Sequence, residues 1–131
     1  MKKRKTEGAD SISEAKRYLA NAREILKIKA GNGVPGYYSD KKYVKMACNT
    51  AWSGVLVALD NKVLPPQKGN RKSVETYKDY LARRNKKALY DFVSAYHTLH
   101  LLGGYDGDLY KKNISNGIEL AENIIDWCKK N

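Results

Sequence analysis

The sequence predicts an all-α protein, folded as an antiparallel four-helix bundle. Apolar side chains recur at three- and four-residue steps along four segments, which is the pattern of helices with one buried face. Glycine and proline clusters separate the segments, so the connections between the helices are expected to be short. No alternation of apolar and polar residues reaches the length of a strand, so a β-sheet is not expected.

The first helix is expected to follow a charged N-terminal segment. Residues 1–10 lack apolar periodicity and are predicted to form a flexible basic tail, so that residues 11–131 make up a single domain. Ser11 and Glu14 have the spacing of a capping box, which predicts a helix start at Ser11. The buried stripe of this helix is predicted at Ala15, Tyr18, Leu19, Ala22, Ile25 and Leu26.

The second helix is predicted to begin near Ser39 or Asp40 and to end near Leu59 or Lys62. Two prolines directly beyond it cannot continue a helix. Its apolar face includes small residues that allow a neighbouring helix to approach closely, namely Ala47, Ala51 and Gly54. We therefore expect this helix to pack tightly at the centre of the bundle.

The last two helices are interrupted by polar segments. Ser73 is a good cap for the third helix, but the basic residues 83–87 break its apolar pattern, so this helix is predicted to be bent or split near Asn85. Two glycines end it, in a segment best interpreted as a tight helix–helix turn. Asp106 or Asp108 can then cap the last helix.

Positive charge is concentrated in the middle of the chain. The formal net charge is +11; residues 62–87 contain nine basic and two acidic residues, whereas residues 88–131 contain four and six. Such an excess attracts polyanions, mostly without sequence preference. It can equally be a solvated face that keeps the protein soluble, and the sequence leaves both interpretations open.

This basic zone is the strongest candidate for a binding surface. Arginine can pair with phosphate through two hydrogen bonds, and an exposed tyrosine can stack on an unpaired base. The zone therefore predicts contacts with RNA or another polyanion. The residues expected to make them are Lys68, Arg71, Lys72, Tyr77, Tyr80, Arg83, Arg84, Lys86 and Lys87.

Both histidines lie in the segment that precedes the last helix. His97 and His100 stand three residues apart, and Tyr105 and Asp106 follow. A histidine can act as a general acid or base near neutral pH, so these four residues are weak catalytic candidates. No His-Glu-x-x-His or Glu-x-x-His pattern is present, and no metal site is expected.

The chain also lacks the marks of several protein classes. No apolar run approaches the length of a membrane span, and the basic N-terminus is not followed by an apolar stretch. Cys48 and Cys128 lie in different predicted helices and form no Cys-x-x-Cys pair, which is typical of reduced thiols. We therefore expect a cytoplasmic protein with no membrane partner and no cofactor.

Four stretches resemble the HEPN superfamily, a group of small α-helical domains of bacteria and archaea. The resemblance covers most of the chain from Ser11 onward and is one of helix pattern and length. It is carried by YLANA at residues 18–22, YVKMACNTAW at 43–52, LHLLGGYDG at 99–107 and GIELAENII at 117–125.

Active HEPN ribonucleases carry an arginine four to six residues before a histidine, and two protomers bring these residues together for RNA cleavage without a metal. Here the nearest arginine, Arg84, lies thirteen residues before His97, so the catalytic residues of the family cannot be carried over. The resemblance implies a helical bundle, homodimerisation, and a fold used in nucleic-acid processing and toxin–antitoxin systems.

The leading hypothesis is thus a non-catalytic binding domain that acts through a homodimeric surface, the basic face, or both. Its partner would be RNA or another macromolecule. One alternative is a divergent ribonuclease that uses His97 or His100 as general acid or base. Another is a protein-interaction module, similar to an antitoxin, with a protein as its partner.

Overall fold

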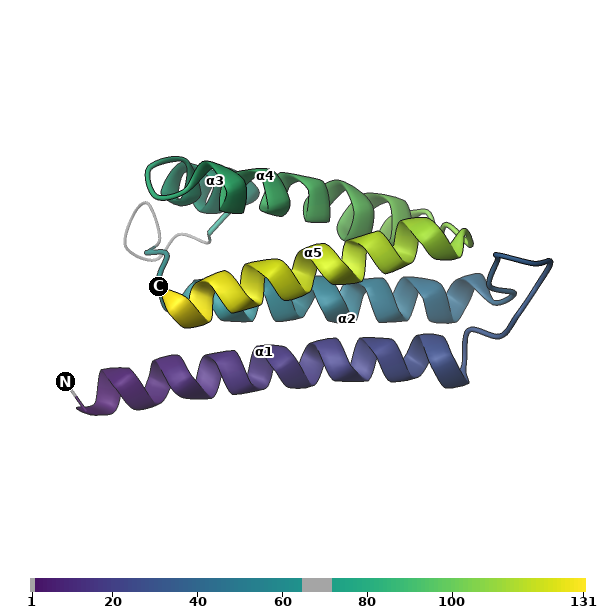
Figure 1. The fold of residues 1–131 in the computed structure, drawn as a ribbon, viewed down its shortest axis with the longest axis horizontal. Coiled ribbons are helices and arrows are strands. Elements are labelled where there is room, and N and C mark those ends of the chain that lie inside the picture. Colours follow the sequence, from purple (N-terminus) through teal and green to yellow (C-terminus); the bar gives the residue numbers. More distant parts are fainter. Residues whose placement is uncertain (1, 65–71) are drawn as a thin grey trace.

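The structure, a computed structural model, describes residues 2–64 and 72–131, with side chains from Asp10 onward, and every named element within these residues is a helix. The predicted all-α class is therefore confirmed. Helices α1, α2, α4 and α5 run along the long axis of the molecule (Figure 1). The elements are α1 (Lys2–Ile28), α2 (Lys41–Asp60), α3 (Val74–Ala82), α4 (Lys86–Ala95), the π-helix η1 (Tyr96–Tyr105) and α5 (Lys111–Lys130).

The first helix begins earlier than predicted. Helix α1 starts at Lys2 and includes residues 2–10, for which the sequence predicts a tail, so a helix start at Ser11 is wrong. Ser11 lies inside α1, where its Oγ accepts a hydrogen bond of 2.6 Å from Nδ2 of Asn61, the residue that follows α2. The polar side chain taken for a helix cap instead joins two helices.

The starts of α2, α3 and α4 agree with the sequence. Asp40 caps α2 by accepting a hydrogen bond from the amide of Lys42, and Ser73 forms a capping box at the start of α3. Asn85 accepts a hydrogen bond of 2.9 Å from the amide of Ala88 and so starts a separate helix, α4. The predicted split near Asn85 is confirmed, and the described residues form five α-helices where the sequence predicts four.

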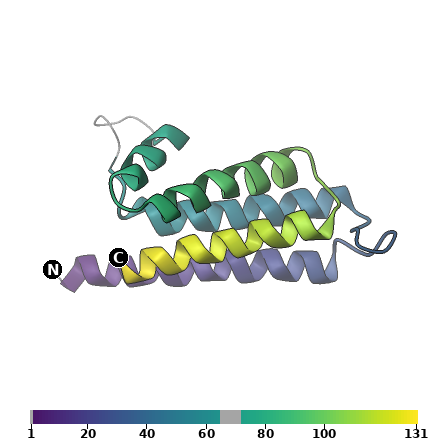
Figure 2. The ribbon, with the colours of Figure 1, turned by 45° about the horizontal axis from the view of Figure 1, so that its top comes forward.

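Helix α3 differs from the others in direction. It stands at an angle to α4 at the end of the molecule where both termini lie (Figure 2). Tyr77 and Leu81 anchor it by their buried side chains, and the ring of Tyr77 lies 5.7 Å from that of Phe92 in α4. The side of α3 that lies opposite Tyr77 and Leu81 is therefore at the molecular surface.

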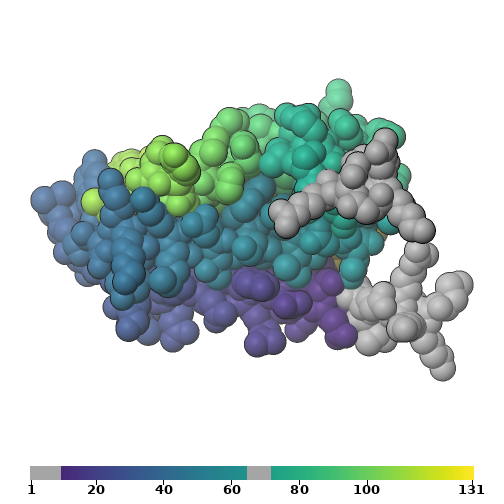
Figure 3. All heavy atoms as spheres, turned by 180° about the vertical axis from the view of Figure 1, so that it is seen from behind, coloured from purple at the N-terminus to yellow at the C-terminus, as the bar shows by residue number. Residues whose placement is uncertain are grey.

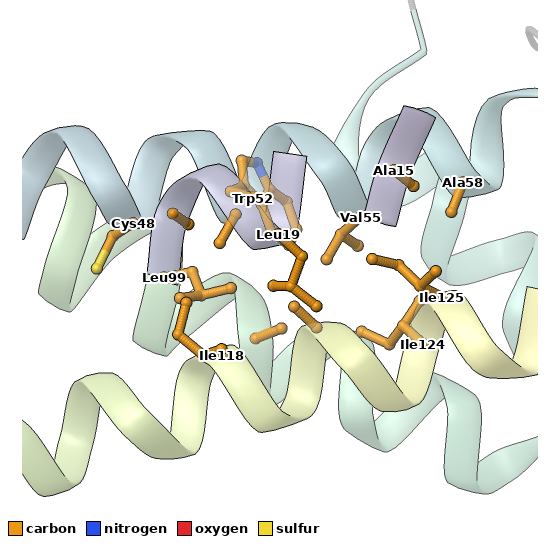
Figure 4. Close-up of a cluster of buried hydrophobic side chains, with 14 of the residues drawn as sticks. Ala15, Leu19, Cys48, Trp52, Val55, Ala58, Leu99, Ile118, Ile124 and Ile125 are labelled. Atoms are coloured by element: carbon orange, nitrogen blue, oxygen red, sulfur yellow. The ribbon is translucent and has the colours of Figure 1, made fainter. Parts of the chain in front are cut away.

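The main core lies between α1, α2 and α5. Helices α1 and α2 lie side by side across one face of the molecule (Figure 3), and α5 packs against both. Large side chains from all three converge there, with Leu19 from α1, Val55 from α2 and Ile124 from α5 (Figure 4). The aromatic ring of Trp52 extends this core to α4, because it lies 5.3 Å from the ring of Phe92.

Glycines allow the helices to approach closely around this core. A Cβ built on Gly54 would lie 3.1 Å from both the carbonyl oxygen of Ala15 and the Cβ of Tyr18, which confirms the small-residue contact predicted for α2. A Cβ on Gly103 would collide with the thiol of Cys48. A Cβ on Gly117 of α5 would lie 2.7 Å from the side chain of Leu99 in η1. Backbone of η1 and α5 therefore occupies space that side chains would otherwise fill.

The connection between α1 and α2 is fixed by the segment that precedes α5. The amide of Tyr38 donates to the carbonyl of Leu109 over 2.8 Å, and the amide of Lys111 donates to the carbonyl of Gly36 over 3.0 Å. Gly36 has a φ of 88°, a conformation that favours glycine. Asp108 accepts hydrogen bonds in this segment from the amide of Tyr110 and the side chain of Asn113. The N-cap of α5 is Tyr110, without a side-chain cap, so the prediction that Asp106 or Asp108 caps this helix is wrong.

Replacing Gly103 with alanine should destabilise the protein, because the new methyl group would overlap Cys48. Overpacking of this kind costs about 1 to 3 kcal/mol. Chemical denaturation measures the change in the free energy of unfolding. Ser53→Ala is an exposed change on α2, the helix that contains Cys48, and serves as the control. It should change the free energy of unfolding by no more than about 0.5 kcal/mol. Equal stability of the two variants would contradict the close approach.

Candidate nucleic-acid interface

A cleft of about 420 Å³ lies where the end of α2 meets α3. It gathers three cations, one acid, one aromatic ring and three smaller or apolar side chains. Its lining residues are Lys62, Val63, Leu64, Thr76, Asp79, Tyr80, Arg83 and Arg84. The capping box at Ser73 and the turn after Ala82 place α3 so that its polar side faces this cleft.

A stacked pair of side chains forms the centre of the cleft. The guanidinium carbon of Arg84 lies 4.7 Å from the centre of the Tyr80 ring, a cation–π distance. Tyr80 is partly exposed, and Arg84 is exposed. The backbone carbonyl of Asp79 accepts a hydrogen bond of 3.3 Å from Nε of Arg83, which leaves the outer nitrogens of that guanidinium to face solvent. Planar groups and positive charge therefore occur together at this site.

Tyr77 does not belong to this surface, so the prediction that it stacks on a base is wrong. Only 6% of Tyr77 is exposed, and its hydroxyl donates to the carboxylate of Asp60 over 2.5 Å. Burial raises the pKa of the Tyr77 hydroxyl, and the hydrogen bond to Asp60 raises it further. The three- and four-residue steps from Val74 to Tyr77 and Leu81 are the signal in the sequence that places Tyr77 on the apolar side of this helix, but composition alone grouped it with Tyr80 in the basic zone.

Two predicted cations already have acidic partners. Lys72 donates to the backbone carbonyl of Asp60 over 2.8 Å and lies 3.4 Å from its carboxylate, which holds the start of α3 on the end of α2. Lys87 forms an ion pair of 2.9 Å with Asp91 within α4. Their charge is partly compensated, so their contribution to a polyanion site is smaller than the sequence predicts.

The remaining predicted cations fall into two groups. Arg83, Arg84 and Lys86 are exposed at the turn between α3 and α4. Lys68 and Arg71 lie outside the described residues, in the connection that leads into α3. Lys62 belongs to the cleft but is missed by the sequence prediction, although its place in the basic zone is a signal that could have identified it.

The histidines lie on η1, away from this cleft. Both imidazoles are exposed, and the His100 ring lies 5.8 Å from the ring of Trp52 and 5.3 Å from that of Tyr96. A π-helix has more residues per turn than an α-helix, so His97 and His100 point further apart around the axis than their spacing predicts. The ring of His97 contacts only the edge of Tyr96, at 5.5 Å.

The other weak catalytic candidates do not complete a site with the histidines. Tyr105 is 77% exposed, and Asp106 is exposed as well. Within residues 2–64 and 72–131, no hydrogen bond or ion pair joins either histidine to an acid. In the same residues, no three His, Cys, Asp or Glu side chains form a cluster that could hold a metal ion.

Comparison with known proteins identifies the family. A model described as a domain of unknown function (DUF5618) matches residues 10–130. The chain belongs to this family. It is also similar to a solved structure, a protein of unknown function from Dyadobacter fermentans, with 46% sequence identity and a TM-score of 0.88 over 94% of this chain and 97% of that chain. No curated protein matches it.

The thiols of this DUF5618 member are unsuited to nucleophilic chemistry. Cys48 and Cys128 are both buried and unpaired. Burial raises the pKa of each thiol to about 12, and the charge of Asp108 adds to the effect at Cys48. Since the thiolate is the reactive form, both side chains are neutral packing groups at physiological pH.

A second cleft, of about 400 Å³, lies between α1 and α5. Two of its three cations have partners within the chain: Arg23 pairs with Glu122 at 2.7 Å, and Lys111 donates to the side chain of Asn32 over 2.5 Å. The third, Lys27, forms no ion pair within the described residues. The described residues contain no helix that is long and apolar enough to cross a membrane. In this DUF5618 chain, the cleft beside α3 differs in that none of its three cations, Lys62, Arg83 and Arg84, forms an ion pair within the described residues.

Proposed function

We propose that this DUF5618 protein is a non-catalytic binding domain that takes single-stranded RNA on the cleft beside α3. The observation that carries this proposal is the stacking of Arg84 on Tyr80 in an open cleft that also contains Lys62 and Arg83. It supports the polyanion interpretation of the basic zone over that of a merely solvated face.

The chemistry of the cleft suits an unpaired strand better than a duplex. A partly exposed tyrosine can stack on any base, which contributes about 1 to 3 kcal/mol per base. Arg83 can pair with a phosphate oxygen through two hydrogen bonds, and Lys62 adds a further positive charge. Asp79, the one acid among the lining residues, would repel phosphate, so the backbone of the strand is expected to pass on the arginine side.

We also propose that the DUF5618 fold is a branch of the HEPN-like domains. In this proposal α1, α2, α4 with η1, and α5 are the four members of an antiparallel bundle, and α3 is an addition outside it. The order and lengths of the long helices support the kinship. The missing arginine before His97 supports a branch without the ribonuclease activity.

Removal of both arginines should weaken RNA binding. The variant Arg83→Ala/Arg84→Ala loses the stacked guanidinium and two charges, and should bind a fluorescently labelled single-stranded oligoribonucleotide at least about tenfold more weakly. Fluorescence anisotropy at two salt concentrations measures this. The wild-type affinity should fall with added salt, and the slope of log K against log salt should be smaller for the variant.

The matched control is Arg17→Ala/Lys112→Ala, which removes the same charge from exposed positions on α1 and α5. Its affinity should change by a much smaller factor than that of the arginine variant. Equal losses in the two variants would show non-specific attraction to net charge, and absence of binding even at low salt would refute the proposal.

The alternative function is a metal-independent ribonuclease that uses His97 or His100. The exposure of both imidazoles is the observation that favours it, since a substrate could reach them. RNA incubated with the wild type and with His97→Ala/His100→Ala decides between the two functions. We expect equal and negligible cleavage by both proteins; cleavage by the wild type alone would replace the binding function with the enzymatic one.

A further inference from the structure

A groove of about 520 Å³ runs between α1 and α2 on the face opposite α5 (Figure 3). Its floor and walls are mostly apolar, and two of the side chains are unusually open for their type: Ile28 is 62% exposed and Met46 is 44% exposed. The hydroxyl of Thr50 donates to the carbonyl of Met46 over 2.8 Å, so its hydrogen-bonding capacity is used within α2. Burying Ile28, Met46 and Thr50 would therefore remove few hydrogen bonds to water.

The residues of α1 that line the groove have the spacing of a helix–helix seam. Tyr18, Asn21, Ile25 and Ile28 follow one another at intervals of three, four and three residues, which is the a/d pattern of a coiled coil. The other stripe of α1, which includes Leu19 and Leu26, is already buried in the core. Tyr18 and Ile25 are half-buried against α2 and the core, whereas Asn21 and Ile28 are exposed, so this second face of α1 is only partly covered within the chain.

Opposite charges stand on the two sides of this seam. Glu24 and Lys29 both line the groove, five residues apart, and within the described part of the chain neither forms an ion pair. This is the spacing at which flanking charges of neighbouring helices pair in coiled coils. In a twofold interface, if one residue contacts a second residue on the partner, the reverse contact forms as well. One Glu24–Lys29 contact therefore implies two.

We infer that this groove is the contact surface for a second copy of the chain, with Glu24 of each copy facing Lys29 of the other. Ile25, Ile28 and Met46 then lie between the two ion pairs, at the centre of the interface. The two charges cancel within the patch, so contact here avoids the repulsion expected between two chains of net charge +11. The nucleic-acid cleft beside α3 is not involved.

Charge exchange tests the pairing. Sedimentation of the full-length wild type should show a dimer that dissociates on dilution. Glu24→Lys and Lys29→Glu each place two like-charge contacts in the dimer, and each should weaken it by at least about tenfold. The double variant Glu24→Lys/Lys29→Glu restores opposite charges and should dimerise like the wild type.

The most specific outcome comes from mixing the two single variants. One then presents lysine at both positions and the other presents glutamate, so a heterodimer should form at concentrations at which each single variant alone associates only weakly. Glu119→Lys, an exposed change on α5, is the charge-matched control and should dimerise normally. Circular dichroism checks that every variant is folded, which is expected because the altered side chains are exposed.

Three results would each overturn the inference. The first is a wild type that remains monomeric up to the highest soluble concentration. The second is single variants that dimerise as well as the wild type, which would place the contact elsewhere. The third is that neither the double variant nor the mixture of single variants associates. This result would show that Glu24 and Lys29 do not pair across the interface. Since no RNA is present, these results do not depend on the proposed function.

Discussion

The close approach of helix backbones to α2 is the constraint on which the rest of the structure depends. Gly54 lies against α1, and Gly103 and Gly104 lie against Cys48 and Asn49 of α2. The side chain of Asn49 also donates a hydrogen bond of 3.3 Å to the carbonyl of Gly104. Because side chains are missing at these contacts, the larger residues of α4 and α5 can fill the remaining space. The core is therefore thin and dense.

Because of this close packing on α2, the residues of η1 that stabilise the fold are separate from the residues of the proposed binding surface on α3. The segment with both histidines passes over α2 as a π-helix whose C-terminal glycines are buried, so much of its sequence serves the contact between η1 and α2. The imidazoles remain at the surface without an acidic partner in the described residues. In contrast, α3 is held by Tyr77 and Leu81 on one side and exposes its cations on the other. The proposed binding surface lies there, at the end of the molecule furthest from η1.

Much of the fold follows from local patterns in the sequence. Asp40, Ser73 and Asn85 mark helix starts correctly because a capping side chain acts on amides two or three residues away. Ser11 fails for a tertiary reason, since its hydroxyl bonds Asn61 fifty residues later. The π-helix escapes prediction because apolar spacing alone does not distinguish five-residue from four-residue hydrogen bonding. Long-range contacts thus decide what local rules leave open.

The candidate site could be predicted only in part, for a similar reason. Composition located the basic zone and Arg84, but the separation of Tyr77 from Tyr80 depends on which side of α3 meets Phe92. The ion pairs of Lys72 and Lys87 likewise depend on acids whose positions are set by the fold. Sequence reasoning therefore located part of the candidate cleft and included residues that lie outside it.

Chemical-shift mapping tests most directly whether function resides at the α3 end of the molecule. Isotope-labelled protein would be titrated with a single-stranded oligoribonucleotide and the amide resonances followed by NMR. The account predicts that the shifts concentrate at Lys62, Tyr80, Arg83 and Arg84 while those of η1 stay unchanged. Shifts centred on His97 and His100, with α3 unaffected, would contradict it.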